Sequence, residues 1–172
     1  MKRFIQKYTG FIRNLRLVHY LYNISHRKGL KRNKHLYPYF DLEKEYQVQR
    51  AIRKLIQKGL VQSAHDCADG GLFITLLESA MVNNLGFDIS TDEDFRKDAF
   101  LFGEAQGRVV VSVKDSDEDA FIDFMSITSV EFTYIGDVAE TDIVIDVEVL
   151  FSVAEAKEIY DTVLEKKLEQ VE

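Results

Sequence analysis

Apolar residues spaced three or four positions apart predict amphipathic helices along much of this 172-residue chain. The clearest helix follows Asp41, a typical N-cap residue, and ends at Gly59, a typical C-cap. A later helix has Asp115 or Ser116 as its cap, and the last one begins after Ser152. The predicted helices cover residues 11–22, 42–58, 72–82, 99–102, 115–125 and 153–167.

Shorter apolar stretches, some rich in β-branched residues, predict strands. They cover residues 60–67, 87–90, 108–113, 132–138 and 143–147, and the first is predicted to be buried. The last two flank a short polar segment, Ala139 to Asp142, which predicts an antiparallel hairpin. Because this irregular order includes a hairpin, it favours an α+β fold, a mixed β-sheet covered by helices, over a purely parallel sheet.

The charge distribution divides the chain into two parts. The net charge is −7, yet residues 1–40 contain ten Lys and Arg and none of the 29 acidic residues. Pro38, the only proline, marks the boundary. We therefore predict a basic N-terminal arm over 1–38 and a folded domain over 39–172. The arm has no repeated basic–aromatic motif, so nucleic acid is a weaker hypothesis than an arm folded on its own acidic body or a degenerate leader.

Composition narrows the class of protein. A hydrophobic content of 46% and a charged content of 30% are typical of a globular domain. No apolar run approaches the roughly 20 residues of a membrane span, and residues 1–7 lack the features of a signal peptide. A single cysteine, Cys67, excludes an internal disulfide. We expect a cytoplasmic protein that does not contact a membrane.

The first candidate for chemistry is a cluster between a predicted strand and a predicted helix. His65, Asp66 and Asp69 precede Gly70 and Gly71, which permit a tight turn and a close backbone approach. Asp69 is a candidate N-cap, and the free N–H groups of such a turn can hold an anion. The alternative is structural: a capping aspartate and a hydrogen-bonded histidine, which the residues alone favour.

The second candidate lies immediately before the strongest predicted strand. Glu104, Gln106 and Arg108 alternate, so an extended segment would project them from one face. Such a face can bind a polar small molecule, or it can be a solvated approach to an edge strand. No catalytic residue and no metal site is predicted, because Cys67 lies within a strand and lacks a ligand partner at a suitable spacing.

Together, these clusters resemble a known family. Ser63-Ala64-His65-Asp66-x-x-Asp69-Gly70-Gly71-Leu72, then Leu101-Phe102-Gly103-Glu104-x-Gln106-x-Arg108, then Ile135-Gly136-Asp137-Val138 resemble the C-terminal region of phosphoribosylformylglycinamidine synthases over residues 39–172. The resemblance implies the fold of the AIR-synthase-related C-terminal domains, a mixed sheet with helices that is partly ferredoxin-like. Residues 1–36 do not match the family, and the arm over 1–38 is expected to be divergent or partly disordered.

The resemblance also implies a function. The family forms an amidine in purine biosynthesis, using ATP and glutamine. By resemblance, ATP or ADP and magnesium bind only in the context of the full enzyme, and its partners are the remaining domains or subunits, including a glutaminase. The nucleotide- or substrate-cleft candidates are then His65, Asp66, Asp69, Gly70, Gly71, Glu104, Gln106 and Arg108.

We therefore expect a carbon–nitrogen ligase fragment that is inactive alone, with homo-oligomerisation through apolar faces that the missing domains would cover. Two alternatives stay open. One is a non-catalytic module that binds a nucleotide or assembles subunits. The weaker one is a nucleic-acid-associated protein that uses the basic arm.

Overall fold

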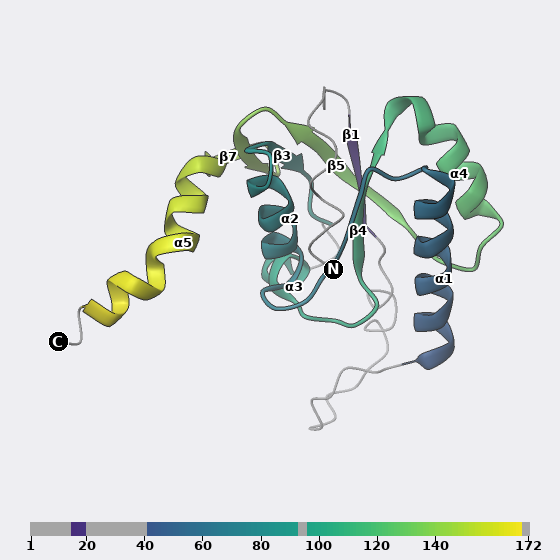
Figure 1. The fold of residues 1–172 in the computed structure, drawn as a ribbon, viewed down its shortest axis with the longest axis horizontal. Coiled ribbons are helices and arrows are strands. Elements are labelled where there is room, and N and C mark those ends of the chain that lie inside the picture. The colour runs from purple at the N-terminus through teal and green to yellow at the C-terminus, as the bar shows by residue number, and fades with distance from the viewer. Residues whose placement is uncertain (1–14, 20–40, 93–95, 170–172) are drawn as a thin grey trace.

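A computed structural model describes residues 15–19, 41–92 and 96–169 of the chain. These residues form a seven-stranded mixed sheet with helices packed on both of its faces (Figure 1). The strand order is β2-β4-β1-β5-β3-β6-β7, in which only β3 and β6 run parallel. The predicted α+β class, a mixed sheet covered by helices, is confirmed.

The strands are short; helices separate the first five of them along the chain, whereas β5, β6 and β7 follow one another directly. The strands are β1 (Leu15–His19), β2 (Ser63–Asp66), β3 (Gly86–Ile89), β4 (Val109–Lys114), β5 (Thr133–Ala139), β6 (Asp142–Ile145) and β7 (Glu148–Ser152). The helices are α1 (Leu42–Lys58), α2 (Gly71–Met81), α3 (Lys97–Phe102), α4 (Glu118–Ser126) and α5 (Val153–Glu169), with a 3-10 turn at Asp115–Asp117.

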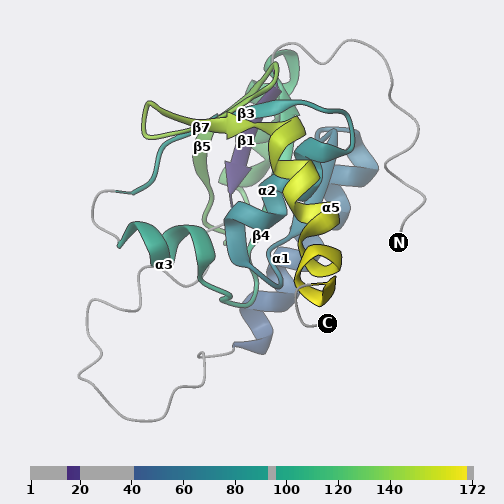
Figure 2. The ribbon, with the colours of Figure 1, turned by 90° about the vertical axis from the view of Figure 1, so that its left-hand side faces the viewer.

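Two apolar clusters lie on opposite faces of the sheet, and β4 contributes to both. Val110 belongs to the cluster with α2, whereas Val111 and Val113 pack with Phe121 and Met125 of α4. This alternation follows from the two-residue repeat of a strand. In Figure 1, α1 and α4 accordingly lie together on one side of the sheet, and α2 and α3 lie on the other. Figure 2, turned by 90°, shows α5 beside α2.

The caps that begin and end the first and last helices agree with the sequence. Asp41 accepts hydrogen bonds from the backbone N–H groups of residues 43 and 44, and Gly59 ends α1 in the left-handed conformation. At α5, Ser152 and Glu155 form a reciprocal capping box: the Glu155 carboxylate accepts from the Ser152 N–H, and the Ser152 hydroxyl accepts from the Glu155 N–H. Asp41, Gly59 and Ser152 are therefore confirmed as caps.

The helix predicted over 11–22 is wrong at residues 15–19, where the chain forms β1 between β4 and β5. Leu15, Leu17 and Val18 fit both a helical and an alternating pattern, and pairing on both edges selects the strand. The rest of that predicted helix lies outside the described residues. Part of the basic arm thus contributes to the central sheet, while the domain boundary at residue 38 stays a prediction.

The predicted hairpin between 132–138 and 143–147 is also wrong. Strand β3 lies between β5 and β6, and β6 pairs in parallel with β3. The antiparallel hairpin instead joins β6 to β7, a strand that was not predicted. Its two-residue loop is Asp146-Val147, with φ of 52° and 70°. The local pattern could not show this, because Val147 is a poor residue for a left-handed turn.

Smaller corrections concern three other elements. The predicted strand 60–67 is shorter, and within the described residues β2 is an exposed edge strand that pairs with β4 alone, not a buried one. The predicted helix over 115–125 begins with a 3-10 turn, and α4 has Asp117, not Asp115 or Ser116, at its N-cap. Asp69 is not a cap, because Gly70 occupies the N-cap of α2.

The β6–β7 loop provides a test of local strain. Replacing Val147 with glycine should stabilise the protein by about 0.5–1 kcal/mol, because a β-branched residue in the left-handed region is strained and Val147, 92% exposed, loses no packing. Thermal unfolding measures the change. Val149→Gly is the control, since Val149 is 63% exposed in β7 and glycine should weaken the strand. Equal melting temperatures for the two variants would contradict the assignment of strain.

Candidate functional site

The turn between β2 and α2 forms the centre of the candidate site. Gly70 and Gly71 both have positive φ, 80° and 66°, so two consecutive residues adopt the left-handed conformation. The Gly71 N–H donates to the Ala68 carbonyl at 3.0 Å, which closes the turn. Helix α2 then begins at Gly71 with no side-chain cap. The conformational freedom of glycine, predicted from the sequence, is therefore required at both positions.

Glu104 joins the two sequence clusters. Its Oε1 accepts a hydrogen bond from the Gly70 N–H at 3.0 Å, although the two residues are 34 positions apart. The carboxylate therefore lies at the N-terminal end of α2, where the helix dipole favours negative charge. The segment that predicts a polar small-molecule site and the glycine turn that predicts an anion site thus form one junction.

Helix α3 reaches the same junction from its C-terminal end. A Cβ built on Gly71 would lie 2.7 Å from the Phe102 carbonyl carbon and 2.9 Å from the Leu101 oxygen. The absence of a side chain at Gly71 is therefore what lets the end of α3 pack against the start of α2. This contact is a second reason, besides the positive φ, why position 71 requires glycine.

Arg108 is buried, with 4% exposure, and holds the end of α3. Its Nη1 donates to the Gly103 carbonyl at 2.6 Å and its Nη2 to the Phe100 carbonyl at 3.0 Å. Burial lowers the pKa of Arg108, and the nearby Cys67 acts in the opposite direction. These bonds satisfy carbonyls that a helix end leaves without intrahelical partners.

His65 lies against α2. Its Nδ1 is 3.1 Å from the Thr75 carbonyl and 3.2 Å from the Ser79 hydroxyl, and its Nε2 is 3.4 Å from Glu78 Oε2. Because a carbonyl oxygen can only accept, the bond to Thr75 requires a proton on Nδ1. Tyr160 of α5 donates to Glu78 at 2.7 Å, and that hydrogen bond raises the pKa of Tyr160. His65 therefore links β2, α2 and α5.

The remaining candidates are exposed. The side chains of Asp66, Asp69 and Gln106 all face solvent, and Asp66 contributes its carbonyl oxygen to a 3.4 Å bond from Thr75 Oγ1. Asp69 and Gln106 flank the Gly70–Glu104 contact along the sequence. The predicted set thus separates into four exposed polar residues around the turn (Asp66, Asp69, Glu104 and Gln106), the two glycines of the turn itself, and two anchoring residues, His65 and Arg108.

The sequence reasoning did not single out the polar residues of α2. Thr75 Oγ1 donates to the Gly71 carbonyl at 2.9 Å, Ser79 donates to the Thr75 carbonyl at 2.9 Å, and Glu78 contacts both His65 and Tyr160. The sequence feature that could have indicated these residues is a polar stripe at three- and four-residue spacing in an otherwise apolar helix. Among the residues that the structure describes, no group of three or more His, Cys, Asp or Glu side chains is placed to hold a metal ion.

Cys67 follows His65 and Asp66 and is buried. Burial raises the pKa of its thiol, while Arg108 and a hydrogen bond with Thr75 act the other way. Because the folded pKa is the higher one, the unfolded chain ionises first, near pH 8.5. This contribution to stability is complete below that pH and is lost as the pH rises.

We therefore expect the unfolding free energy to fall more steeply between pH 7.5 and 9.5 in the native sequence than in the variant Cys67→Ala. Urea unfolding at several pH values measures both slopes, and their difference removes the contribution of lysines and tyrosines. Labelling with a thiol reagent should also be slow until urea unfolds the protein. Identical pH slopes would contradict the burial of a protonated thiol.

Comparison with known proteins identifies the family to which the chain belongs. The sequence profile of the family "AIR synthase related protein, C-terminal domain" matches residues 21–148. The chain therefore belongs to this family, and the turn and polar segment described above lie within the matched region. The match begins at residue 21, so the expectation that residues 1–36 do not match the family is wrong from residue 21 onward.

Several curated relatives are subunits of one kind of synthase. The chain is 39% identical over 99 residues to phosphoribosylformylglycinamidine synthase subunit PurL of Moorella thermoacetica, covering 58% of the chain and 14% of the relative. It is 51% identical over 81 residues to PurL of Salinibacter ruber, and 34% identical over 127 residues to PurL of Petrotoga mobilis. The latter match covers 73% of the chain and 17% of that relative. The chain thus spans less than a fifth of the length of these curated relatives.

Solved structures share the fold. The structure of Thermotoga maritima PurL complexed with ATP has a TM-score of 0.64 at 16% identity, covering 82% of the chain and 25% of that protein. The hydrogenase maturation protein HypE has a TM-score of 0.55 at 15% identity, covering 77% of the chain and 49% of that protein. These likenesses support the α+β assignment. Among the described helices, none is both long and apolar enough to cross a bilayer.

Proposed function

We propose that the chain is the C-terminal domain of a phosphoribosylformylglycinamidine synthase and serves amidine formation in purine biosynthesis only as part of the larger enzyme. The observation that carries this proposal is the junction of the Gly70-Gly71 turn with Glu104, which lies within the region that matches the family. The PurL relatives, matched over a small part of their length, support the same reading.

The glycine turn and the exposed polar residues around it border the proposed nucleotide cleft. Gly70 and Gly71 present the start of α2, Glu104 holds that turn in place, and Asp66, Asp69 and Gln106 supply polar groups around it. His65 and Arg108 act indirectly, as positioning residues, because their hydrogen bonds to the backbone hold α2 and α3 in place. None of these residues is proposed as catalytic.

The rest of the chemistry lies with other parts of the enzyme. ATP or ADP with magnesium is proposed to bind when the remaining domains complete the cleft, and a glutaminase partner is proposed to supply ammonia. T. maritima PurL has been solved with ATP and with ADP, which supports nucleotide binding in the complete enzyme. We place the assembled enzyme in the cytoplasm.

A complementation assay tests this function. A PurL-type synthase truncated before its C-terminal domain should form the amidine from formylglycinamide ribonucleotide (FGAR), ATP and glutamine only when the present chain is added in excess. The glutaminase is included in every reaction. A chain carrying Gly71→Val, which should disrupt the α2–α3 junction, is the negative control. If the native chain restores no turnover to a truncated synthase that binds it, the proposed function is wrong.

Calorimetry then tests the site itself. In the reconstituted enzyme, Glu104→Ala should weaken ADP–magnesium binding about tenfold, because the turn loses a charge-assisted hydrogen bond. Glu131→Ala is the matched control, since Glu131 is exposed and lies outside the turn and the polar segment. Equal affinities for the two variants would mean that Glu104 does not contribute to the nucleotide cleft. They would not contradict the assignment of the domain.

A second function, that of a non-catalytic assembly module, has one observation in its favour. The Glu104 carboxylate already occupies the Gly70 N–H at the start of α2, where an anionic ligand would otherwise bind. For an assembly module, the chain should bind the truncated synthase with equal affinity whether or not ADP is present. A dependence on ADP would favour the nucleotide cleft.

A further inference from the structure

The turn before α2 contains the only Asp–Gly pair of the chain, Asp69-Gly70, and the sequence has no Asn–Gly pair. In such a pair the backbone nitrogen of the glycine can attack the side-chain carboxyl carbon of the aspartate, because glycine has no side chain that hinders the approach. Asp69 is exposed, so solvent reaches its carboxyl group. The pair therefore has the chemistry for a rearrangement of the backbone.

This rearrangement is balanced in water and requires no other reactant. With the Asp69 carboxyl group protonated, its carbon forms a bond to the Gly70 nitrogen. The carboxyl hydroxyl and the proton of that nitrogen leave together as water, and the product is a five-membered succinimide ring. Water then opens the ring at either carbonyl. Opening at the main-chain carbonyl gives isoaspartate, in which the backbone runs through the former side chain and the α-carboxylate becomes the side group.

Glu104 opposes the attack through the nitrogen. The Gly70 N–H donates to Glu104 Oε1 at 3.0 Å, a charge-assisted hydrogen bond. Because the nitrogen must lose this proton when it attacks, the bond to the carboxylate has to break first. The negative charge of Glu104 also disfavours a second negative charge on the nitrogen beside it. The contact therefore holds Gly70 in an unreactive state.

The conformation of the turn acts in the same direction. The Gly71 N–H donates to the Ala68 carbonyl at 3.0 Å, and Gly70 has a φ of 80° and a ψ of 4°. These angles are those of the third residue of a type II turn, whose second residue, here Asp69, has a ψ of about 120°. This angle directs the Gly70 nitrogen away from the Asp69 side chain, so ring closure requires the turn to open.

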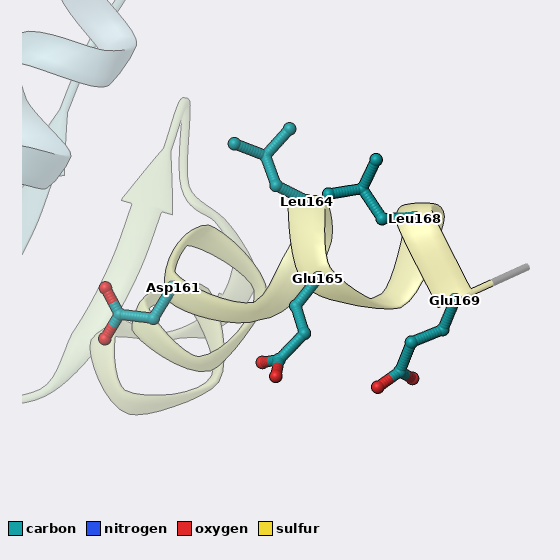
Figure 3. Close-up of a pocket in the computed structure, with 5 residues that line it drawn as sticks. All are labelled: Asp161, Leu164, Glu165, Leu168 and Glu169. Carbon is teal, nitrogen blue, oxygen red and sulfur yellow. The ribbon is translucent and has the colours of Figure 1, made fainter.

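Exposure by itself does not make an aspartate reactive, and Asp161 of α5 illustrates this. Figure 3 shows Asp161 projecting from the same side of the helix as Glu165 and Glu169, and its side chain is 51% exposed. The next residue, Thr162, has a branched side chain that hinders its own nitrogen, and its N–H lies within the hydrogen-bonded interior of α5. Asp161 is therefore an internal reference, exposed but without a following glycine.

We propose that Asp69 is a site of spontaneous isoaspartate formation and that Glu104 slows the reaction by holding the Gly70 N–H. Isoaspartate adds a methylene group to the backbone directly before α2. The junction has no room for a longer chain, because even a Cβ on Gly71 would lie 2.7 Å from the Phe102 carbonyl carbon. The modification therefore separates the glycine turn from the end of α3. This inference does not depend on the proposed role in purine biosynthesis.

Incubation of the folded chain at neutral pH, below its melting temperature, tests the proposal. Isoaspartate is quantified with an isoaspartyl methyltransferase and located by mass spectrometry in the tryptic peptide 59–96. Glu104→Ala should form it about tenfold faster than the native chain, because the turn opens without breaking a charge-assisted hydrogen bond. Glu104→Gln is the matched control: its amide oxygen still accepts from the Gly70 N–H, so the increase should be smaller. The peptide 158–166, which contains Asp161, should stay unmodified.

Unfolding in urea separates the contribution of the fold from that of the sequence. In urea, the native chain and Glu104→Ala should react at equal rates, and both should react faster than the folded native chain. This comparison tests the protection by the fold even if circular dichroism shows that Glu104→Ala does not fold. Asp69→Glu should remove the signal at position 69, because its longer side chain cannot close a five-membered ring. Equal rates for the folded native chain and folded Glu104→Ala, or no acceleration in urea, would overturn the proposal.

Discussion

Replacing Gly71 with alanine should destabilise the protein by about 2–5 kcal/mol and loosen the junction of α2 with α3. The φ of 66° costs an L-residue about 1–2 kcal/mol. The new Cβ would also lie 2.7–2.9 Å from backbone atoms of Leu101 and Phe102, and overpacking of this kind costs about 1–3 kcal/mol more. Backbone atoms of a packed helix end cannot move aside as the tip of a side chain can.

Gly59→Ala is the control for this prediction. Gly59 has a similar φ of 70°, but a Cβ built there meets nothing within 4 Å. Urea unfolding of both variants therefore separates the backbone contribution from the steric one, and Gly71→Ala should lose about 2 kcal/mol more than Gly59→Ala. Equal losses would mean that α3 does not pack against Gly71 as described.

Replacing Arg108 with methionine should cost about 2–4 kcal/mol. The guanidinium is buried and donates to the carbonyls of Gly103 and Phe100, so its removal leaves two acceptors at the end of α3 without these donors. Arg108→Lys should recover only part of the loss, because one ammonium cannot reproduce the planar geometry that reaches both carbonyls.

Chemical unfolding measures both Arg108 variants, with Arg96→Met as the control. Arg96 pairs with Asp98 on the surface, and exposed pairs of this kind contribute little to stability. Arg96→Met should therefore leave the unfolding midpoint unchanged within error. If Arg108→Met were as stable as Arg96→Met, Arg108 would be available to a ligand, and its assignment as a positioning residue would be wrong.

Much of the fold follows from short-range signals. The N-cap at Asp41, the C-cap at Gly59 and the capping box at Ser152 specify where the two longest helices begin or end, because a capping residue acts on neighbouring N–H or C=O groups. The glycine turn was also predictable, since few other residues adopt a left-handed conformation twice in succession.

The two largest errors concern partners that are distant in sequence. Residues 15–19 have an apolar pattern that fits two structures, and the neighbouring strands β4 and β5 decide between them. The segments of β5 and β6 are adjacent in sequence, yet β3 lies between them because its own residues Phe87 and Ile89 are needed in the core. Local propensity does not determine whether residues 15–19 form a helix or a strand, or which strand lies between β5 and β6.

In the candidate site, too, some features follow from the local sequence and others from the packing of distant elements. The sequence by itself determined which polar residues accompany the glycine turn, and that two separate segments carry them. Only the tertiary structure decided that Glu104 contacts Gly70, that Arg108 is directed into the protein, and that His65 of β2 contacts α2, whose Glu78 also binds Tyr160 of α5. The physical reason is that residue type and spacing determine which bonds a side chain can make, whereas the packing of distant elements determines which of these bonds it does make.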